Sequence, residues 1–391
     1  MADVARGKQH FEFATSAPGC TKHKAANSAL GQMSLPMIKN DWNRTVTKAE
    51  LDDTANTTKR EKIVRKTQVA GRKESLAMRF LRRWGTIVVL LAAGAGFSLA
   101  SPYFATFSNL NNILFSMIVS ALVSLGLTWV VVAGSFDLSI GLTVTTSSIV
   151  VAFLIPVLGP WVAIGVALLA ACLIGAVNGL LVTYGRLSGI VVTLGVMFVL
   201  SGINIFITGG YQVPVGYDES AFLYLGQGKL GMVGVPVLIL LAVFLVALIA
   251  GSRTRIGHYI AAVGDNPVAA FYSGINVYRW VILAFILSAL MAGIAGVLVT
   301  SISSSAQPVG GEGYLLEAFA AVFLGATVLG KGKPHLLGTL IGVFFLYMVD
   351  SGMNMVGFPF AARHIFQGSV LIIAVGANAL LNREEVHLKF I

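Results

Sequence analysis

Charged side chains are scarce in this chain of 391 residues: Asp, Glu, Lys and Arg make up 11% of it, against 56% hydrophobic residues. A soluble domain usually carries about a quarter charged residues, so this composition excludes an ordinary soluble protein. Cysteine is also rare, and the two that occur, Cys20 and Cys172, exclude a disulfide-stabilised scaffold. With a mean hydropathy of +0.82, the composition indicates a membrane protein.

Residue patterns for catalysis and metal binding are equally scarce. The six histidines are scattered, and none occurs in the His-Glu-x-x-His spacing that would bind zinc. Residues 325–332, Gly-Ala-Thr-Val-Leu-Gly-Lys-Gly, resemble a phosphate-binding loop, but Gly332 replaces the hydroxyl residue that would bind Mg²⁺. We interpret this segment as the end of a helix, and we expect no metal site, no cofactor and no ATP hydrolysis by the chain itself.

Long apolar runs dominate the rest of the chain. A helix needs about 20 apolar residues to cross a bilayer core about 30 Å thick, and ten runs reach or approach this length. The sequence therefore predicts an all-α, polytopic membrane protein with about ten transmembrane helices. The expected helices cover residues 86–101, 112–133, 139–158, 161–183, 190–208, 232–251, 279–300, 315–330, 336–351 and 364–381.

The net charge of +10 is concentrated before the first apolar run, where residues 1–85 hold 17 Lys and Arg against 8 Asp and Glu. A basic segment beside a membrane is typical of the cytoplasmic side. Nucleic-acid binding would need a recognition helix or interleaved aromatic residues, and neither is evident. With this segment inside, the inner loops hold eight Lys or Arg residues and the outer loops two, Lys229 and Arg363. The charges thus predict that both termini are cytoplasmic.

Three segments follow from these patterns. Residues 1–83 form a basic, polar extension that we expect to be cytoplasmic and largely disordered. It has no signal-peptide pattern, and a regulatory role or a true start further along the chain both stay open. Residues 84–382 form the transmembrane domain, and residues 383–391 form a short cytoplasmic tail.

A polar stretch, residues 252–277, interrupts the apolar runs on the expected cytoplasmic side. Asp265 or Asn266 can cap a helix there, Pro267 suits its first turn, and Gly274 can end it. The result is a short helix between two membrane spans, too small to be a domain but suited to be gripped by a soluble partner. Because Ala269 and Ala270 are small, we expect the face that carries them to fit closely into a groove of that partner.

The sharpest short motif is Gly134-Ser-Phe-Asp-Leu-Ser-Ile-Gly141, between two apolar runs. Asp137 can cap the helix that begins near Leu138. Alternatively, Asp137 faces a polar cavity, because ionisable residues at membrane depth are rare and usually functional. Other polar residues in the apolar runs either bond helices together or line a path for a hydroxyl-rich solute. They are Asn178, Asn204, Glu317, Asp350 and Gln367.

In combination and order, these motifs resemble the monosaccharide-type ABC importer permeases, which handle ribose, xylose, arabinose, galactose and autoinducer-2. Residues 134–141 resemble the family's Gly-Gly-Ile-Asp-Leu-Ser-x-Gly element, and residues 262–270, Ala-Val-Gly-Asp-Asn-Pro-Val-Ala-Ala, resemble its coupling segment. Residues 320–325 and 337–342 resemble its C-terminal element, so the resemblance covers about residues 84–382. The chain departs from the usual family residues at His258, Val268 and Ser135-Phe136.

The resemblance implies a permease subunit that moves a monosaccharide or a similar polyhydroxylated solute across the bacterial plasma membrane. The implied partners are membrane lipid, a second permease subunit in a homo- or heterodimer, two cytosolic ATPases, and an extracytoplasmic sugar-binding protein. The ATPases would contact the coupling loop, residues 252–279, at Gly264, Asp265, Asn266, Pro267, Ala269, Ala270 and Gly274. The candidate translocation path contains Gly134, Asp137, Ser139, Gly141, Asn178, Asn204 and Glu317.

Two other classes of function stay open. An ion-coupled secondary transporter would use Asp137, Glu317 or Asp350 to carry a proton or Na⁺, but it would not need the capped cytoplasmic helix. An intramembrane enzyme or a passive scaffold is not favoured by any convergent set of catalytic residues. Which sugar is moved, and whether the permease pairs with itself, are also left open by the sequence.

Overall fold

The structure is a computed structural model that describes residues 76–216, 220–328 and 332–381. The expectations for Cys20, for residues 1–75 of the N-terminal extension and for the tail at 383–391 lie outside these residues. The first described helix, α2, begins at Leu76, which is inside the stretch that the sequence assigned to the extension.

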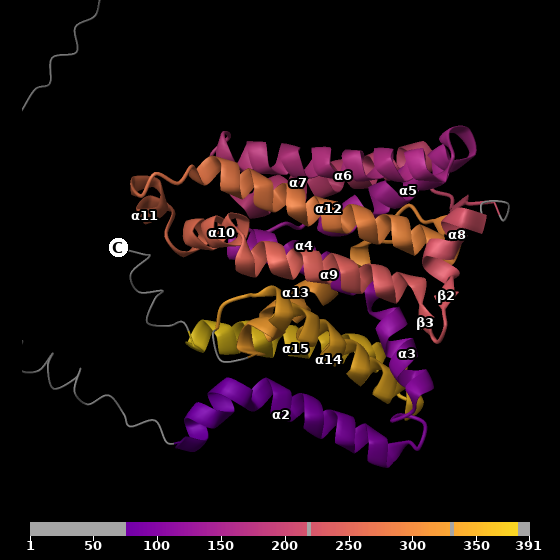
Figure 1. The fold of residues 1–391 in the computed structure, drawn as a ribbon, viewed down its shortest axis with the longest axis vertical. Coiled ribbons are helices and arrows are strands. Elements are labelled where there is room, and N and C mark those ends of the chain that lie inside the picture. The colour runs from indigo at the N-terminus through magenta and orange to yellow at the C-terminus, as the bar shows by residue number, and fades with distance from the viewer. Residues whose placement is uncertain (1–75, 217–219, 329–331, 382–391) are drawn as a thin grey trace, which may run out of the picture. The chain divides into compact units, whose positions relative to one another are not determined.

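The described chain is mostly helical, as the apolar runs predict, and its four strands are two residues long each. Figure 1 shows the long helices side by side. In chain order the elements are α2 (Leu76–Ala100), α3 (Phe107–Ser116), α4 (Ile118–Val132), α5 (Ile140–Leu158), α6 (Pro160–Thr183), α7 (Gly189–Thr208), β1 (Val213–Pro214), α8 (Ser220–Gln227), β2 (Lys229–Leu230), β3 (Val233–Gly234), α9 (Val235–Arg253), α10 (Arg255–Asp265), α11 (Pro267–Tyr272), α12 (Val277–Ser303), β4 (Ser305–Ala306), α13 (Glu312–Thr327), α14 (Leu336–Met355) and α15 (Phe360–Leu381).

Most residues of the ten predicted apolar runs lie in helices, but the run at 112–133 is divided between α3 and α4, the run at 232–251 begins before α9, and not every helix has the length of a membrane span. Residues 329–330 of the run at 315–330 lie outside the described residues. Among the described residues, six helices are long and apolar enough to cross a membrane, namely α5, α6, α7, α9, α12 and α14. A seventh span results if α3 and α4, which meet at Met117 with a bend of 49°, count as one. The apolar parts of α2 and α15 are shorter, and α13 has 16 residues.

Helix α12 lies at the centre of the packing and contacts α4, α5 and α6. Small residues permit this closeness: a Cβ atom at Gly175 of α6 would lie 2.5 Å from the Phe285 carbonyl oxygen, and one at Gly179 would lie 2.7 Å from the Cα atom of Ile282. The small-xxx-small pattern at 175–179 therefore lets the two backbones touch. Residues 338–342 of α14 pack on α13 in the same way.

The short elements gather at the two ends of the long helices. Helix α11 lies at one end, and α8 lies at the other together with the β2–β3 hairpin (Figure 1). Strand β1 pairs antiparallel with β4, which joins the 209–216 loop to the C-terminal end of α12. The polar coupling segment and the described parts of the 209–234 connection are thus at opposite ends of the helices.

Helices α5 and α13 do not begin at the end of the helix layer. Ser288, near the middle of α12, bonds to the residue that starts the turn into α5. The backbone N–H of Gly311, just before α13, donates to Thr145 of α5 at 2.9 Å. Residues 133–139, and residues 307–311 after strand β4, are irregular segments that lead into these starts. Irregular backbone at such depth is tolerated only where it is buried in protein or lines a cavity.

Candidate functional site

The coupling segment contains two short capped helices in succession, α10 and α11. The Thr254 hydroxyl accepts from Ile256 N at 3.2 Å and begins α10. The Asn266 side chain accepts from Ala269 N at 3.0 Å and begins α11, so Asn266, rather than Asp265, is the cap. Pro267 occupies the first turn, and Gly274 has a φ of +81° just after the helix ends. The short helix predicted from these residues is therefore present.

The two alanines of α11 face in different directions, which corrects the expectation that both meet a partner. Ala270 is only 5% exposed and belongs to a cluster of buried residues with Val263, Val281 and Phe285. Ala269 is exposed. A helix of six residues has too few positions for the sequence to show which face turns inward, so Ala270 is a contact within the chain and not a docking residue.

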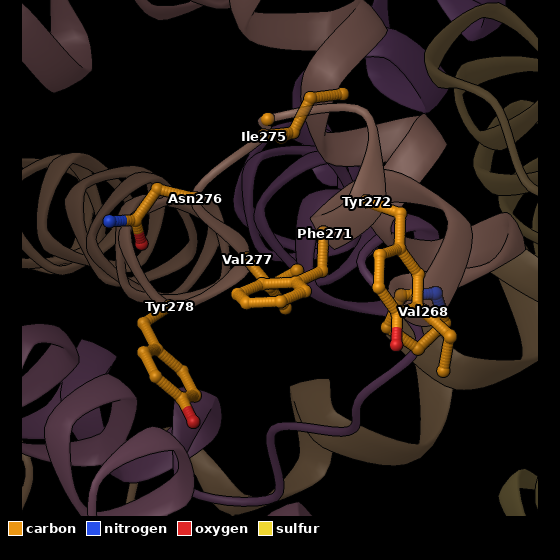
Figure 2. A pocket seen from close by; sticks show the side chains of 9 residues that line it. Val268, Phe271, Tyr272, Ile275, Asn276, Val277 and Tyr278 are labelled. Carbon is orange, nitrogen blue, oxygen red and sulfur yellow. The ribbon is translucent and has the colours of Figure 1, made fainter.

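The exposed face of α11 is aromatic. Phe271 is 66% exposed and Tyr272 is 83% exposed, and Val268 stands beside them in a groove of about 580 Å³. Figure 2 shows these side chains together with Tyr278 from the first turn of α12. Exposed apolar side chains clustered on a polar loop mark a protein contact surface. The sequence analysis did not single out Phe271 and Tyr272, because it expected the small residues Ala269 and Ala270 to contact the partner.

The coupling segment is in direct contact with the 134–141 motif. A Cβ atom at Gly264 of α10 would overlap the carbonyl oxygen of Val132 at the end of α4. A Cβ atom at Gly134, whose φ is +81°, would lie 3.5 Å from the Gly264 Cα atom. Asp265 forms an exposed ion pair with Lys333 at 2.7 Å, which connects α10 to the segment before α14. A displacement of α10 would therefore shift the backbone at the start of the 134–141 motif.

Asp137 is 1% exposed and its carboxylate is fully engaged within the chain. Its Oδ1 accepts from the backbone N–H of Ser139 at 3.0 Å and from the Ser139 hydroxyl at 2.7 Å. Its Oδ2 accepts from the Ser288 hydroxyl of α12 at 3.1 Å. The carboxylate thus closes the turn at residues 137–139, directly before α5, and joins this turn to α12. The N-cap of α5 is Ser139 and has no side-chain capping bond, so Asp137 orders the turn ahead of the helix and is not its cap, and the bond to α12 is a connection that the sequence did not indicate.

Asn178 and Asn204 bond α5 to the helices that follow it. The Asn178 amide of α6 donates to the Ser139 hydroxyl at 2.8 Å, so Asn178 joins the Asp137 cluster. The Thr146 hydroxyl of α5 donates to the side-chain oxygen Oδ1 of Asn204 in α7 at 3.1 Å. Both asparagines are buried, with contacts that fit a role between helices. The structure therefore brings together Asp137, Ser139 and Asn178, while Asn204 lies apart from them.

Glu317 belongs to a second polar cluster, between α4, α13 and α14. Its carboxylate accepts hydrogen bonds from Ser120 and from Tyr347, the latter at 2.7 Å. Beside it lies a cavity of about 130 Å³ that Asp350, Arg363 and Gln367 also line. Asp350 and Arg363 form an ion pair at 3.2 Å. The sequence missed Ser120 and Tyr347 because single hydroxyl residues are common in apolar helices.

The segment that resembles a phosphate loop lies at the end of α13, as interpreted from the sequence. Helix α13 ends at Thr327, and Gly325 packs against Gly338 of α14. Residues 329–331 lie outside the described residues. In the described part of the chain, no group of three or more His, Cys, Asp or Glu side chains is placed to hold a metal ion.

Comparison with known proteins decides the family. Residues 109–375 match the family described as branched-chain amino acid transport system / permease component. The chain belongs to this permease family. It is 36% identical to the ribose import permease protein RbsC of Escherichia coli K12 over 312 residues, which cover 79% of this chain and 97% of RbsC.

Other members of this permease family match the chain along most of its length. The D-allose transport system permease protein AlsC of the same strain is 30% identical over 308 residues, 78% of this chain and 94% of AlsC. The L-arabinose ABC transporter permease protein AraH of Azospirillum brasilense is 30% identical over 297 residues, 75% of this chain and 87% of AraH. With the apolar helices, the comparisons confirm the predicted ABC importer permease and the multi-pass protein of the inner membrane.

Proposed function

We propose that this permease is the membrane-spanning subunit of an ABC importer for a monosaccharide, driven by ATPases on separate chains. Support comes from the relatives that are named for ribose, allose and arabinose. The observation that carries the role of the ATPases is the exposed aromatic face of α11. A partner that fills this groove would bury Phe271 and Tyr272, and aromatic side chains of this kind often dominate the binding energy of an interface.

In this proposal two permease subunits pair, two ATPases bind the coupling segments, and an extracytoplasmic binding protein delivers the sugar at the opposite end. When the ATPases close, they displace α11 and α10. Because Gly264 touches the end of α4 and the 134–141 segment, that displacement reaches the start of α5. The permease then shifts between two packings of its helices, outward-open and inward-open.

The topology that goes with this proposal has ten membrane passes and both termini in the cytoplasm. The two shorter apolar helices and α13 would complete the count, supported by neighbouring helices that satisfy their ends. A reporter fused after residue 265 should be cytoplasmic, and a reporter fused near Gly226 should be extracytoplasmic. The opposite result would contradict the charge distribution on which the orientation depends.

The test of ATPase docking is to replace Phe271 by Ala. Phe271 is exposed, so the permease should insert and fold normally. Loss of a buried aromatic anchor costs an interface about 2 kcal/mol or more, which weakens binding roughly thirtyfold. Co-purification with the ATPase, and sugar uptake by cells, should both fall.

The matched control is Tyr211→Ala, which removes an exposed aromatic side chain from the opposite end of the helices. It should leave ATPase co-purification unchanged. If Phe271→Ala and Tyr272→Ala both bound the ATPase like the unchanged permease, the docking proposal would fail.

The energy source separates this proposal from the ion-coupled alternative. In the structure the candidate carriers are engaged: Asp350 pairs with Arg363, and Glu317 accepts two hydroxyl hydrogen bonds. Sugar uptake should therefore stop when cellular ATP is depleted, and it should survive an uncoupler as long as ATP is maintained. Uptake that persists without ATP and collapses with the uncoupler would favour the ion-coupled transporter.

A further inference from the structure

A second polar cavity, of about 240 Å³, lies where α5, the C-terminal end of α12, β4 and the first turn of α13 meet. Its polar lining consists of hydroxyl and amide side chains and contains no charged residue. These side chains belong to Thr145, Ser148, Ser303, Ser305, Gln307 and Tyr314.

The cavity has a buried floor and an exposed rim. Thr145 and Ser148 of α5 are buried, whereas Ser303 and Gln307 are exposed. The rim adjoins the 209–216 loop, because the Gln212 amide donates to the Ser305 hydroxyl and β1 pairs with β4. In the proposed topology the rim therefore opens toward the side from which the sugar arrives.

The polar side chains on the floor of the cavity are hydrogen-bonded to other residues of the chain, whereas two polar groups of the lining are not. Thr145 accepts from Gly311 N at 2.9 Å, and the hydroxyls of Ser148 and Thr300 are 2.6 Å apart. Within the described residues, neither the Gln307 amide nor the Tyr314 hydroxyl has a hydrogen-bond partner in the chain. Two polar groups that line a cavity and are left unpaired by the protein are placed to bond a solute.

We propose that this cavity is a binding site for one monosaccharide within each permease subunit, an inference that rests on the proposed function. An uncharged lining suits a neutral solute, and hydroxyl and amide groups match sugar hydroxyls because both donate and accept. The Tyr314 ring adds a flat apolar surface. At about 30 Å³ per water, the cavity has the space of about eight waters, which suits a single small sugar.

The neighbouring cavity at Glu317 does not have these properties. It is about half as large, about 130 Å³ against about 240 Å³, and it is lined by two carboxylates and a guanidinium group. Its charged groups are also already engaged within the chain, because Asp350 pairs with Arg363 and Glu317 accepts from Ser120 and Tyr347. Of these two cavities, the one at Gln307 and Tyr314 is the one that fits the solute.

The direct test is protection of a cysteine placed in the rim of the cavity. Gln307→Cys is made in a chain whose Cys20 and Cys172 are replaced by Ser, and the assembled transporter in membranes is labelled with a membrane-impermeant thiol reagent. D-ribose, D-allose and L-arabinose are added separately at high millimolar concentration, with L-leucine as the amino-acid probe. At least one sugar should slow labelling several-fold, and L-leucine should not.

Two further cysteine variants make this result interpretable. Tyr211→Cys, exposed at the same end but outside the cavity lining, should be labelled at the same rate with and without sugar. Ser303→Cys gives a second position in the rim if the Gln307 variant does not assemble. Equal labelling with and without every sugar at both rim positions, or protection by L-leucine alone, would overturn the sugar site.

Substitutions within the lining test whether the site selects the sugar. Tyr314→Phe removes only the hydroxyl, and one lost hydrogen bond should raise the sugar concentration for half-maximal protection by about threefold to tenfold. Tyr211→Phe is the matched control and should change nothing. Sugar uptake by the unchanged permease separates the two proposals. If uptake occurs but no sugar protects, the cavity proposal fails alone; if no sugar is taken up, the proposed function fails.

Discussion

Replacing Asp137 tests whether its carboxylate is a structural acceptor that orders the turn before α5, or a charge that transport requires. Asp137→Leu removes the acceptor of three donors: the Ser139 N–H, the Ser139 hydroxyl and the Ser288 hydroxyl. The hydroxyls can turn to other oxygens, but the backbone N–H is left unpaired in a buried site. Leaving the N–H without a partner costs about 1–3 kcal/mol of stability, and the two hydroxyl hydrogen bonds contribute about 0.5–1.5 kcal/mol each.

The expected loss for Asp137→Leu is therefore about 2–6 kcal/mol of stability. Asp137→Asn keeps one acceptor oxygen for Ser139, and its amide can donate to the Ser288 oxygen, so no donor is orphaned. We expect it to cost less than about 1 kcal/mol, because an Asn side chain can accept from the backbone N–H two residues on in the same way as Asp. Thermal unfolding of the detergent-purified permease, read by size-exclusion chromatography, measures the difference, and uptake by cells measures function.

The control for the loss of a carboxylate is Asp265→Leu, at the exposed ion pair with Lys333. A surface pair contributes about 0–1 kcal/mol, so this variant should unfold close to the temperature of the unchanged permease. The structural interpretation of Asp137 is refuted if Asp137→Asn is folded and inserted but takes up no sugar, since the loss of the charge would then be decisive. It is also refuted if Asp137→Leu is as stable as the unchanged permease.

Three other changes test the packing on which the proposals depend. Ala270→Arg buries an unpaired charge and should lower the unfolding temperature. Ala269→Arg, at an exposed position, should lower only ATPase co-purification; equal unfolding temperatures for the two would contradict the assigned faces. Gly175→Leu should overlap α12 and cost about 1–3 kcal/mol or more, whereas Gly165→Leu, with no atom within 4 Å of its Cβ position, should be neutral in the same unfolding assay. Gly264→Val should separate α10 from α4, leaving ATPase co-purification intact while uptake falls; unchanged uptake would show that this contact does not transmit movement.

The sequence predicted features that depend on neighbouring residues. Apolar runs of about 20 residues indicate helices because lipid cannot bond an open backbone, and the described residues of the predicted runs are mostly helical. The cap at Asn266 and the stop at Gly274 follow from local hydrogen bonding and backbone freedom. The small-xxx-small pattern at 175–179 predicted the close packing of α6 on another helix, because small residues let helix backbones approach each other in membranes.

Features that depend on distant residues were not predictable. The partners of Asp137 and Glu317 lie 151 and 197 positions away, at Ser288 and Ser120, and nothing in one sequence marks them. Ala270 is buried because it packs against α4, α10 and α12, and the six residues of α11 alone do not show which of its sides these helices cover. The cavity at Tyr314 depends on where α5, the C-terminal end of α12 and the first turn of α13 meet, whereas the apolar pattern shows only which residues form a helix and not which other helices lie beside it.

One chain of contacts connects the coupling segment to the proposed sugar site. Gly264 of α10 touches the end of α4 and Gly134, and Asp137 then fixes the start of α5 to α12. One turn further on, Gly141 meets Gly311, and Thr145 accepts from the N–H of Gly311 at 2.9 Å. Thr145 and Gly311 are also part of the lining of the cavity. A displacement of α10 therefore cannot move the start of α5 without changing the shape of the space beside Tyr314. Since packed helices switch between discrete arrangements and do not deform smoothly, ATPase closure and release of the sugar would be two consequences of the same rearrangement.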